Sequence, residues 1–104
     1  MLKESVNPLE LIHTDLCDLK FVQIRGGNKY FVTFIDDCTR FCYVYLMHSK
    51  DEVLDKFKIF KTKVELQCET FIKCLRTDKR GEYYDEKYFE YVSIIHQVTA
   101  PYSL

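Results

Sequence analysis

The chain has 104 residues, a length that supports a single small domain with one hydrophobic core. Its composition, 47% hydrophobic and 30% charged with only 3 Gly and 2 Pro, is that of a folded globular protein and excludes a disordered segment. A formal net charge of −1 excludes nucleic-acid binding driven by overall charge, because such binding needs Lys and Arg to neutralise phosphates, so any nucleic-acid contact must be local.

The first half of the sequence predicts three consecutive strands. Leu9–Leu19 mixes apolar and short polar residues, and residues 21–24 continue this strand or form a bulged edge. An Arg-Gly-Gly-Asn turn leads into the clearest strand, Lys29–Ile35, which is rich in aromatic and β-branched residues. After a polar break, Phe41–Met47 forms the third strand. Short connections between successive strands indicate an antiparallel meander.

A helix is predicted next, from Lys50 to Gln67. Ser49 followed by Glu52 has the pattern of a capping box at its start. Four apolar residues recur at helical spacing and predict the buried face: Val53, Phe57, Phe60 and Val64. The Lys-rich opposite face is expected to be solvated.

The remaining elements alternate strand and helix. A strand is predicted at Phe71–Thr77, a short helix from Asp85 to Tyr91, and a last strand over residues 93–100. The order βββαβαβ predicts an α/β (α+β) fold with a mixed sheet and helices packed on its faces. The strand after the long helix must run parallel to a neighbour, because a helix separates it from the meander.

Two aspartates follow or end predicted strands. Asp15 lies toward the end of the first strand, on one face with Leu11 and His13, and Asp78 directly follows the fourth strand. If these two strands are neighbours that run the same way, both carboxylates meet at one edge of the sheet. Mg²⁺ needs only one or two carboxylates with water and substrate phosphates. From spacing alone, however, an Asp at a strand end is more often a turn residue or a helix cap.

Four blocks of sequence resemble the integrase catalytic core of Copia-type (Ty1/copia) LTR retrotransposons, which is part of a Gag-Pol polyprotein. They run from Pro8 to Ser103 in the order and spacing of that family: PLELIHTDLCDL, GGNKYFVTFIDDCTRFCYVYLMHSKDEV, LRTDKRGEY and IIHQVTAPYS. The resemblance implies a ribonuclease-H-like fold, with residues 1–8 as a lead-in and 9–104 as a partial catalytic domain. It also implies that Asp15 and Asp78 are the first two catalytic, metal-binding acids of a D, D, E triad.

The resemblance implies a chemistry and its partners as well. Mg²⁺ or Mn²⁺ held by such a triad flanks the reacting phosphorus, and DNA is the substrate of both end processing and strand transfer. Integrases of this family work as multimers, so a homo-oligomer is implied, and no small-molecule substrate is expected. Lys73, Arg76, Lys79 and Arg80 form the densest basic cluster and are predicted to contact DNA; a solvated charged edge is the alternative.

The sequence departs from the family pattern at the third acid of the triad. In this family a Glu lies about thirty-five residues after the second Asp, on a helix that returns it to the metals. Residues 79–104 end before that position, so we expect a C-terminally truncated core that lacks the final helices and is inactive alone. Glu82 belongs to a different position of the family pattern and is expected to be a loop residue. Arg80 stands where the family usually has Gly, which adopts special backbone conformations freely.

Other polar residues have a structural interpretation. Asp36 and Asp37 fit a hairpin turn, and His13 and His96 are expected to be hydrogen-bonded core or rim residues rather than general bases. The five cysteines are odd in number and scattered, which favours reduced thiols over a disulfide framework.

The sequence also indicates a cellular setting and leaves alternatives open. Residues 1–7 do not form a signal peptide and no stretch reaches the roughly 20 apolar residues of a membrane span, so an intracellular protein of the nucleus or cytoplasm is expected, without a membrane partner. A non-catalytic ribonuclease-H-like domain that binds nucleic acid or protein, and an unstable relic, are the alternatives to a catalytic ancestry.

Overall fold

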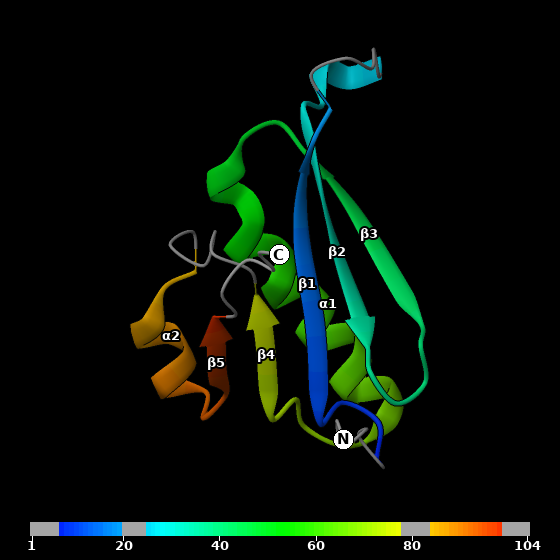
Figure 1. Ribbon diagram of the computed structural model, residues 1–104, viewed down its shortest axis with the longest axis vertical. Coiled ribbons are helices and arrows are strands. Elements are labelled where there is room, and N and C mark those ends of the chain that lie inside the picture. Colours follow the sequence, from blue (N-terminus) through cyan, green and yellow to red (C-terminus); the bar gives the residue numbers. More distant parts are fainter. Residues whose placement is uncertain (1–6, 20–24, 78–83, 99–104) are drawn as a thin grey trace, which may run out of the picture.

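The computed structural model describes residues 7–19, 25–77 and 84–98, and in these residues five strands form one mixed sheet (Figure 1). The strand order is β3-β2-β1-β4-β5. The strands are β1 (Leu11–Asp18), β2 (Tyr30–Asp36), β3 (Cys42–Met47), β4 (Cys74–Thr77) and β5 (Ile95–Val98). The meander β1-β2-β3 is antiparallel, whereas β4 runs parallel to both β1 and β5. The predicted fold class and element order are therefore confirmed.

All five described strands begin later than the sequence predicted, and for β1 and β4 the structure gives the reason. Leu9 does not start β1, because its backbone takes a left-handed conformation with a φ of 67°. Its carbonyl accepts the N–H of Lys73 at 3.1 Å, which ties the start of the chain to the irregular segment before β4. β4 accordingly begins at Cys74 rather than Phe71. Residues 21–24, predicted to extend the first strand, lie outside the described residues.

The turn between β1 and β2 follows the predicted Gly-Gly pattern. Gly26 and Gly27 have φ values of 84° and 72°, a conformation that glycine adopts without steric cost. They belong to the short 3-10 turn η1 (Arg25–Gly27). This local sequence therefore sets the direction in which the chain returns to form β2.

The long helix begins as predicted. A 3-10 turn, η2 (Lys50–Glu52), leads directly into α1 (Val53–Cys68). Oε2 of Glu52 accepts the backbone N–H of Ser49 at 2.8 Å and that of His48 at 2.9 Å, which is the glutamate arm of the predicted capping box. The helix ends where Glu69 takes a left-handed conformation with a φ of 54°. In the described residues no helix is long and apolar enough to cross a membrane.

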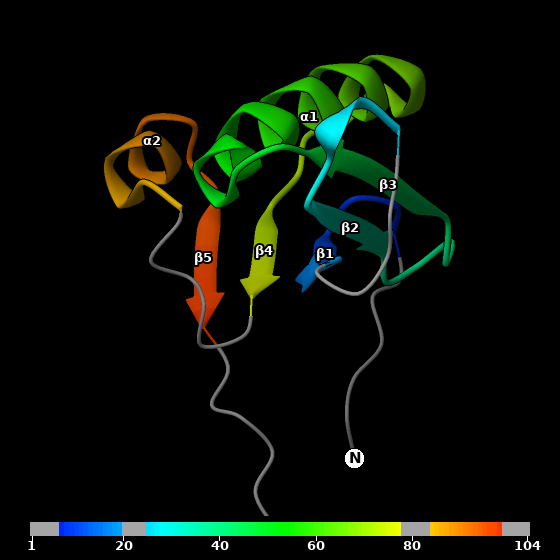
Figure 2. The same ribbon diagram turned by 90° about the horizontal axis from the view of Figure 1, so that it is seen from above.

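Both helices, α1 and α2 (Glu86–Tyr91), lie on the same face of the sheet (Figure 2). The predicted inner face of α1 is buried, and its aromatic rings pack on Phe34 of β2. The ring centroids of Phe34 and Phe60 are 4.7 Å apart in a stacked arrangement, and those of Phe34 and Phe57 are 5.7 Å apart. Such pairs contribute about 0.5–1.5 kcal/mol each beyond the area that they bury. This cluster holds the meander to α1.

The opposite face of the sheet is not covered by any described helix (Figure 2). Alternate residues of each strand point to it, as the period of two requires. Its β3 side and the β5 edge are apolar and open, with Val44 56% exposed, Leu46 44% and Ile95 63%. We call this surface the uncovered face.

Candidate active site

Asp15 lies on the uncovered face, inside β1, which continues to Asp18. Its neighbours Thr14 and Leu16 are buried against the helices, whereas Asp15 itself is exposed. Leu11 and His13 share its side of the strand, as predicted. In the described part of the chain its carboxylate takes part in one weak hydrogen bond, in which Sγ of Cys17 donates to Oδ2 at 3.8 Å. Among the described residues no basic side chain forms an ion pair with Asp15.

The strand that leads to the second predicted acid lies next to β1. β1 and β4 pair in parallel, with Leu11 opposite Cys74 and His13 opposite Arg76. β4 ends at Thr77, and Asp78 is the next residue of the chain. Asp78 itself lies outside the described residues, as do Lys79, Arg80 and Glu82. The sequence-based prediction required β1 and β4 to be neighbours that run in the same direction, and they are.

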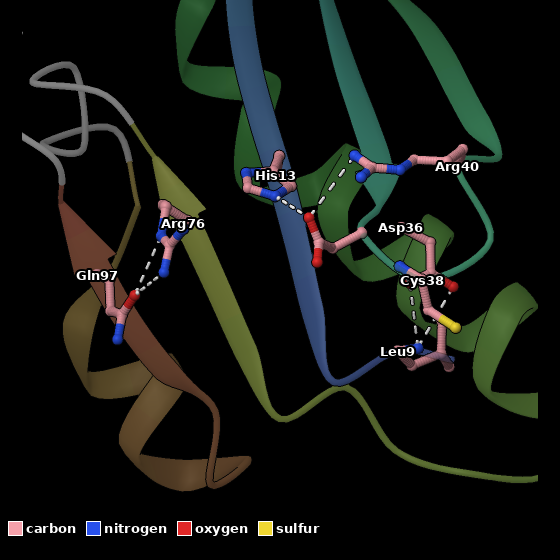
Figure 3. Close-up of polar contacts among 8 residues, drawn as sticks. Leu9, His13, Asp36, Cys38, Arg40, Arg76 and Gln97 are labelled. Carbon is pink, nitrogen blue, oxygen red and sulfur yellow. Dashed lines mark hydrogen bonds and ion pairs between the residues drawn. The ribbon is translucent and has the colours of Figure 1, made fainter. Parts of the chain in front are cut away.

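Lys73 and Arg76, two residues of the predicted basic cluster, lie toward opposite ends of β4. Lys73 precedes β4, and its ammonium lies 4.0 Å from Oε2 of Glu10. Arg76 lies near the other end of β4, on the uncovered face, where its Nε and Nη2 donate to Oε1 of Gln97 at 3.2 and 3.0 Å (Figure 3). Lys73 therefore meets an acid, whereas Arg76 is held by a neutral amide that orients the guanidinium and leaves its charge in place.

His13 is hydrogen-bonded, as the sequence predicted. Its Nε2 lies 2.9 Å from Oδ1 of Asp37, and Nη1 of Arg40 lies 3.8 Å from the same oxygen (Figure 3). The backbone N–H of Asp37 also donates to the carbonyl of Leu11 at 3.0 Å. This group joins the β2–β3 turn to β1 beside the candidate site.

Asp36 is a structural residue, as the turn interpretation held. It is only 6% exposed, and both of its carboxylate oxygens lie 3.3 Å from the backbone nitrogen of Leu9 (Figure 3). It also accepts the N–H of Cys38 and the hydroxyl hydrogen of Thr39, each at 3.1 Å. These bonds fix the left-handed conformation of Leu9 and close the turn.

A buried polar network on the helix-covered face was not predicted. Oγ1 of Thr77 lies 3.0 Å from Nε2 of His96, and Oγ1 of Thr14 lies 3.0 Å from the hydroxyl of Tyr84. His96 was expected to be hydrogen-bonded, but no role was predicted for Thr14 or Thr77. The available signal was that each is a polar residue at an inward-facing strand position directly before a candidate acid.

The one cavity of note in the described residues lies away from Asp15. It measures about 240 Å³ and is apolar, between the start of β1, the β2–β3 turn and the second half of α1. Leu9, Phe41, Tyr43 and Phe60 contribute to its wall. Because it opens on the helix-covered side of the sheet, it takes no part in the chemistry of the candidate acids.

The residues present fit a hard divalent cation in part. The described residues contain no group of three or more His, Cys, Asp or Glu side chains that could hold a metal ion. Asp15 offers an exposed oxygen ligand on the central strand β1. Mg²⁺ commonly takes only one or two protein carboxylates and completes its shell with water and phosphate oxygens. The donor chemistry therefore suits Mg²⁺ or Mn²⁺ if a second carboxylate lies near Asp15.

The topology of the sheet defines a class. The chain matches a solved structure described as a simian T-cell lymphotropic virus intasome in complex with PP2A regulatory subunit B56 gamma, with a TM-score of 0.71. The match covers 99% of this chain and 36% of the other at 10% identity. A likeness at this identity shows the fold, which is the ribonuclease-H-like fold of an integrase core.

Sequence comparison narrows the class. The chain is 40% identical over 102 residues to the "Retrovirus-related Pol polyprotein from transposon TNT 1-94" of Nicotiana tabacum, a match that covers 95% of this chain and 8% of that protein. It is 37% identical over 79 residues to the corresponding polyprotein from transposon RE2 of Arabidopsis thaliana, covering 76% of this chain and 5% of the relative. No protein-family model matches. Over most of its length the chain is therefore homologous to Ty1/copia Gag-Pol polyproteins, and the predicted resemblance is confirmed.

Proposed function

We propose that this chain carries two of the acids of a metal-dependent DNA integrase, Asp15 and Asp78. The observation that carries the proposal is the parallel pairing of β1 with β4, because it brings the strand of Asp15 beside the strand that Asp78 follows. Consecutive Cα atoms are about 3.8 Å apart, so the backbone of Asp78 starts one step from Thr77. Because the chain spans only 8% of its tobacco relative, the activity of a whole polyprotein remains part of this proposal.

The chain's own residues would hold the metal and orient the DNA. A bound Mg²⁺ or Mn²⁺ supplies charge stabilisation at the phosphorus and activates the attacking oxygen. Asp15 provides a carboxylate held by a central strand, and Asp78 provides the second. The reaction class is phosphodiester cleavage followed by transfer to a DNA strand.

Arg76 is the described basic residue best placed to contact the DNA backbone. It lies on the same face as Asp15, and its partner among the described residues is the neutral Gln97. Its guanidinium is therefore oriented without being neutralised, and guanidinium binds phosphate well. Lys79 and Arg80, which follow Asp78 in the sequence, are proposed to extend this contact.

The described chain is proposed to contribute metal binding and DNA binding through these residues. A multimer with DNA is proposed as the working form, in keeping with the family resemblance. The competing function is a module that binds nucleic acid without any metal.

Titration calorimetry with Mn²⁺ tests the proposal on the purified chain. We expect binding in the wild type that is lost in both Asp15→Asn and Asp78→Asn, because each removes one charged oxygen ligand. Asp55→Asn is the matched control, since Asp55 is exposed on α1. Binding that survives both substitutions would contradict the assignment of the acids. Salt-sensitive DNA binding in a chain that takes up no Mn²⁺ would favour the non-catalytic module.

A further inference from the structure

We propose that Thr77, His96 and Glu86 form a positioning relay that fixes the carboxyl end of β4 for metal binding, an inference that rests on the function proposed above. The three residues come from three elements. Thr77 is the last residue of β4, His96 lies on the neighbouring strand β5, and Glu86 is the first residue of α2. None of them is a proposed metal ligand, so the relay acts through the backbone that it holds.

The relay runs from the surface to the strand end through a buried ring. Oε1 of Glu86 lies 2.5 Å from Nδ1 of His96, and Nε2 of the same ring lies 3.0 Å from Oγ1 of Thr77. The His96 side chain is 1% exposed and Thr77 is 3% exposed, whereas the Glu86 side chain is 64% exposed. The helix terminus is thereby connected to the end of β4 without passing through solvent.

The hydrogen-bond chemistry gives this relay a direction. A carboxylate only accepts, so Nδ1 of His96 carries the hydrogen and donates it to Glu86. In the neutral ring Nε2 then accepts the hydroxyl hydrogen of Thr77. The rings of Tyr84 and Phe89 pack on the imidazole, with centroids 5.5 and 5.0 Å away, and fix its plane. The two hydrogen bonds and the flanking rings thus fix the position and the plane of the imidazole.

A purely structural purpose does not require these residue types. An apolar side chain would fill the position of His96 without the cost of burying two ring nitrogens that need partners. A buried threonine also precedes the other acid, since Thr14 directly precedes Asp15 and its Oγ1 lies 3.0 Å from the hydroxyl of Tyr84. Each strand that leads to a proposed acid therefore carries a buried threonine with a side-chain hydrogen bond, from Thr14 to Tyr84 just before α2 and from Thr77 to His96 of β5.

Two substitutions at Thr77 separate positioning from packing. Thr77→Val keeps the shape and removes the hydroxyl, and we expect it to weaken Mn²⁺ binding by about tenfold or more, the usual effect of losing a residue that orients a metal site. Thr77→Ser retains the hydroxyl and should restore affinity to within about twofold of the wild type. Thr62→Val, at an exposed position of α1, is the control and should leave affinity unchanged.

A second pair of variants covers the case in which Thr77→Val does not fold. Glu86→Ala removes the surface end of the relay, and Glu90→Ala is its control because both glutamates are exposed on α2. Affinity should fall only in Glu86→Ala, with circular dichroism showing that both chains are folded.

The outcomes that overturn the relay differ from those that overturn the function. Asp15-dependent Mn²⁺ binding of wild-type strength in Thr77→Val, or an equal loss in Thr77→Val and Thr77→Ser, would overturn the relay alone. A wild-type chain that binds no Mn²⁺, or whose binding survives Asp15→Asn, would overturn the proposed function and the relay with it.

Discussion

Arg76 and Lys73 show how two cations only three positions apart take different roles. Lys73 lies before β4 and meets Glu10, whereas Arg76 lies on the uncovered face and is held by Gln97. Arg76 is placed on the uncovered face by the alternation of the strand, whereas Lys73 lies outside the strand and near Glu10. A basic side chain that already forms an ion pair with an acid is expected to bind phosphate less favourably than a basic side chain held by a neutral amide.

At this scale we predict that Arg76→Gln weakens binding of duplex DNA and lowers the slope of log affinity against log salt by about 1, the effect of losing one phosphate contact. Fluorescence anisotropy over a range of salt concentrations measures both quantities. Lys87→Gln removes an equal charge from the exposed surface of α2 and serves as the control. An identical slope in wild type and Arg76→Gln would show that Arg76 does not touch the backbone.

The strand face on which Asp15 lies was easier to predict than the hydrogen-bond partners of Thr14 and Thr77. Strand periodicity placed Asp15 on one face with His13, and the structure agrees, because alternation is a local property of the chain. The links from Thr14 to Tyr84 and from Thr77 to His96 span 70 and 19 residues. Nothing local encodes such partners, since they exist only after β4, β5 and α2 have packed.

Among the elements, the buried face of α1 was predicted correctly, since its apolar spacing and its capping glutamate are local signals. A capping glutamate and apolar residues at helical spacing are sufficient to define such a helix. The first residues of all five described strands were predicted too early. For β1 and β4 the reason is that the left-handed turn at Leu9 and its bond to Lys73 are tertiary features. The first and last residues of a strand therefore depend on the tertiary contacts that those residues make.

For α1 we predict that Phe60→Ala lowers the free energy of unfolding by about 3–5 kcal/mol, because it empties a buried site between Phe34 and Tyr43. Ile59→Ala, one position earlier on the same helix, should change it by no more than about 0.5 kcal/mol, since Ile59 is 53% exposed. Urea denaturation followed by circular dichroism measures both. Similar losses in the two variants would mean that the aromatic cluster does not hold α1 to the sheet.

Across the whole molecule the two halves of the sheet differ in extent. The β1–β2 ladder runs from Ile12 opposite Asp36 to Asp18 opposite Tyr30, whereas the β1–β4 ladder in the described residues runs only from Leu11 opposite Cys74 to His13 opposite Arg76. Short ladders at the side of a sheet open more readily than long central ones. Asp15 therefore lies on the strand that the longer and the shorter ladder share.

We predict that backbone amides of β5 exchange with solvent deuterium faster than those of β2 under native conditions, because local opening of a short edge costs less than global unfolding. Hydrogen exchange followed by nuclear magnetic resonance resolves the individual amides. Equal protection of β2 and β5 would show instead that the sheet opens only as a unit.

The place of β1 in the sheet has a consequence for synthesis of the chain. β1 is made before the other four described strands, yet it becomes the centre of the sheet, with β2 on one side and β4 on the other. Its partner on the second side begins only at Cys74, after the whole of α1 has been made. During translation the nascent meander thus exposes an unpaired strand edge, the feature by which unfinished chains add to one another. Binding of a chaperone to that edge would protect the chain until β4 emerges.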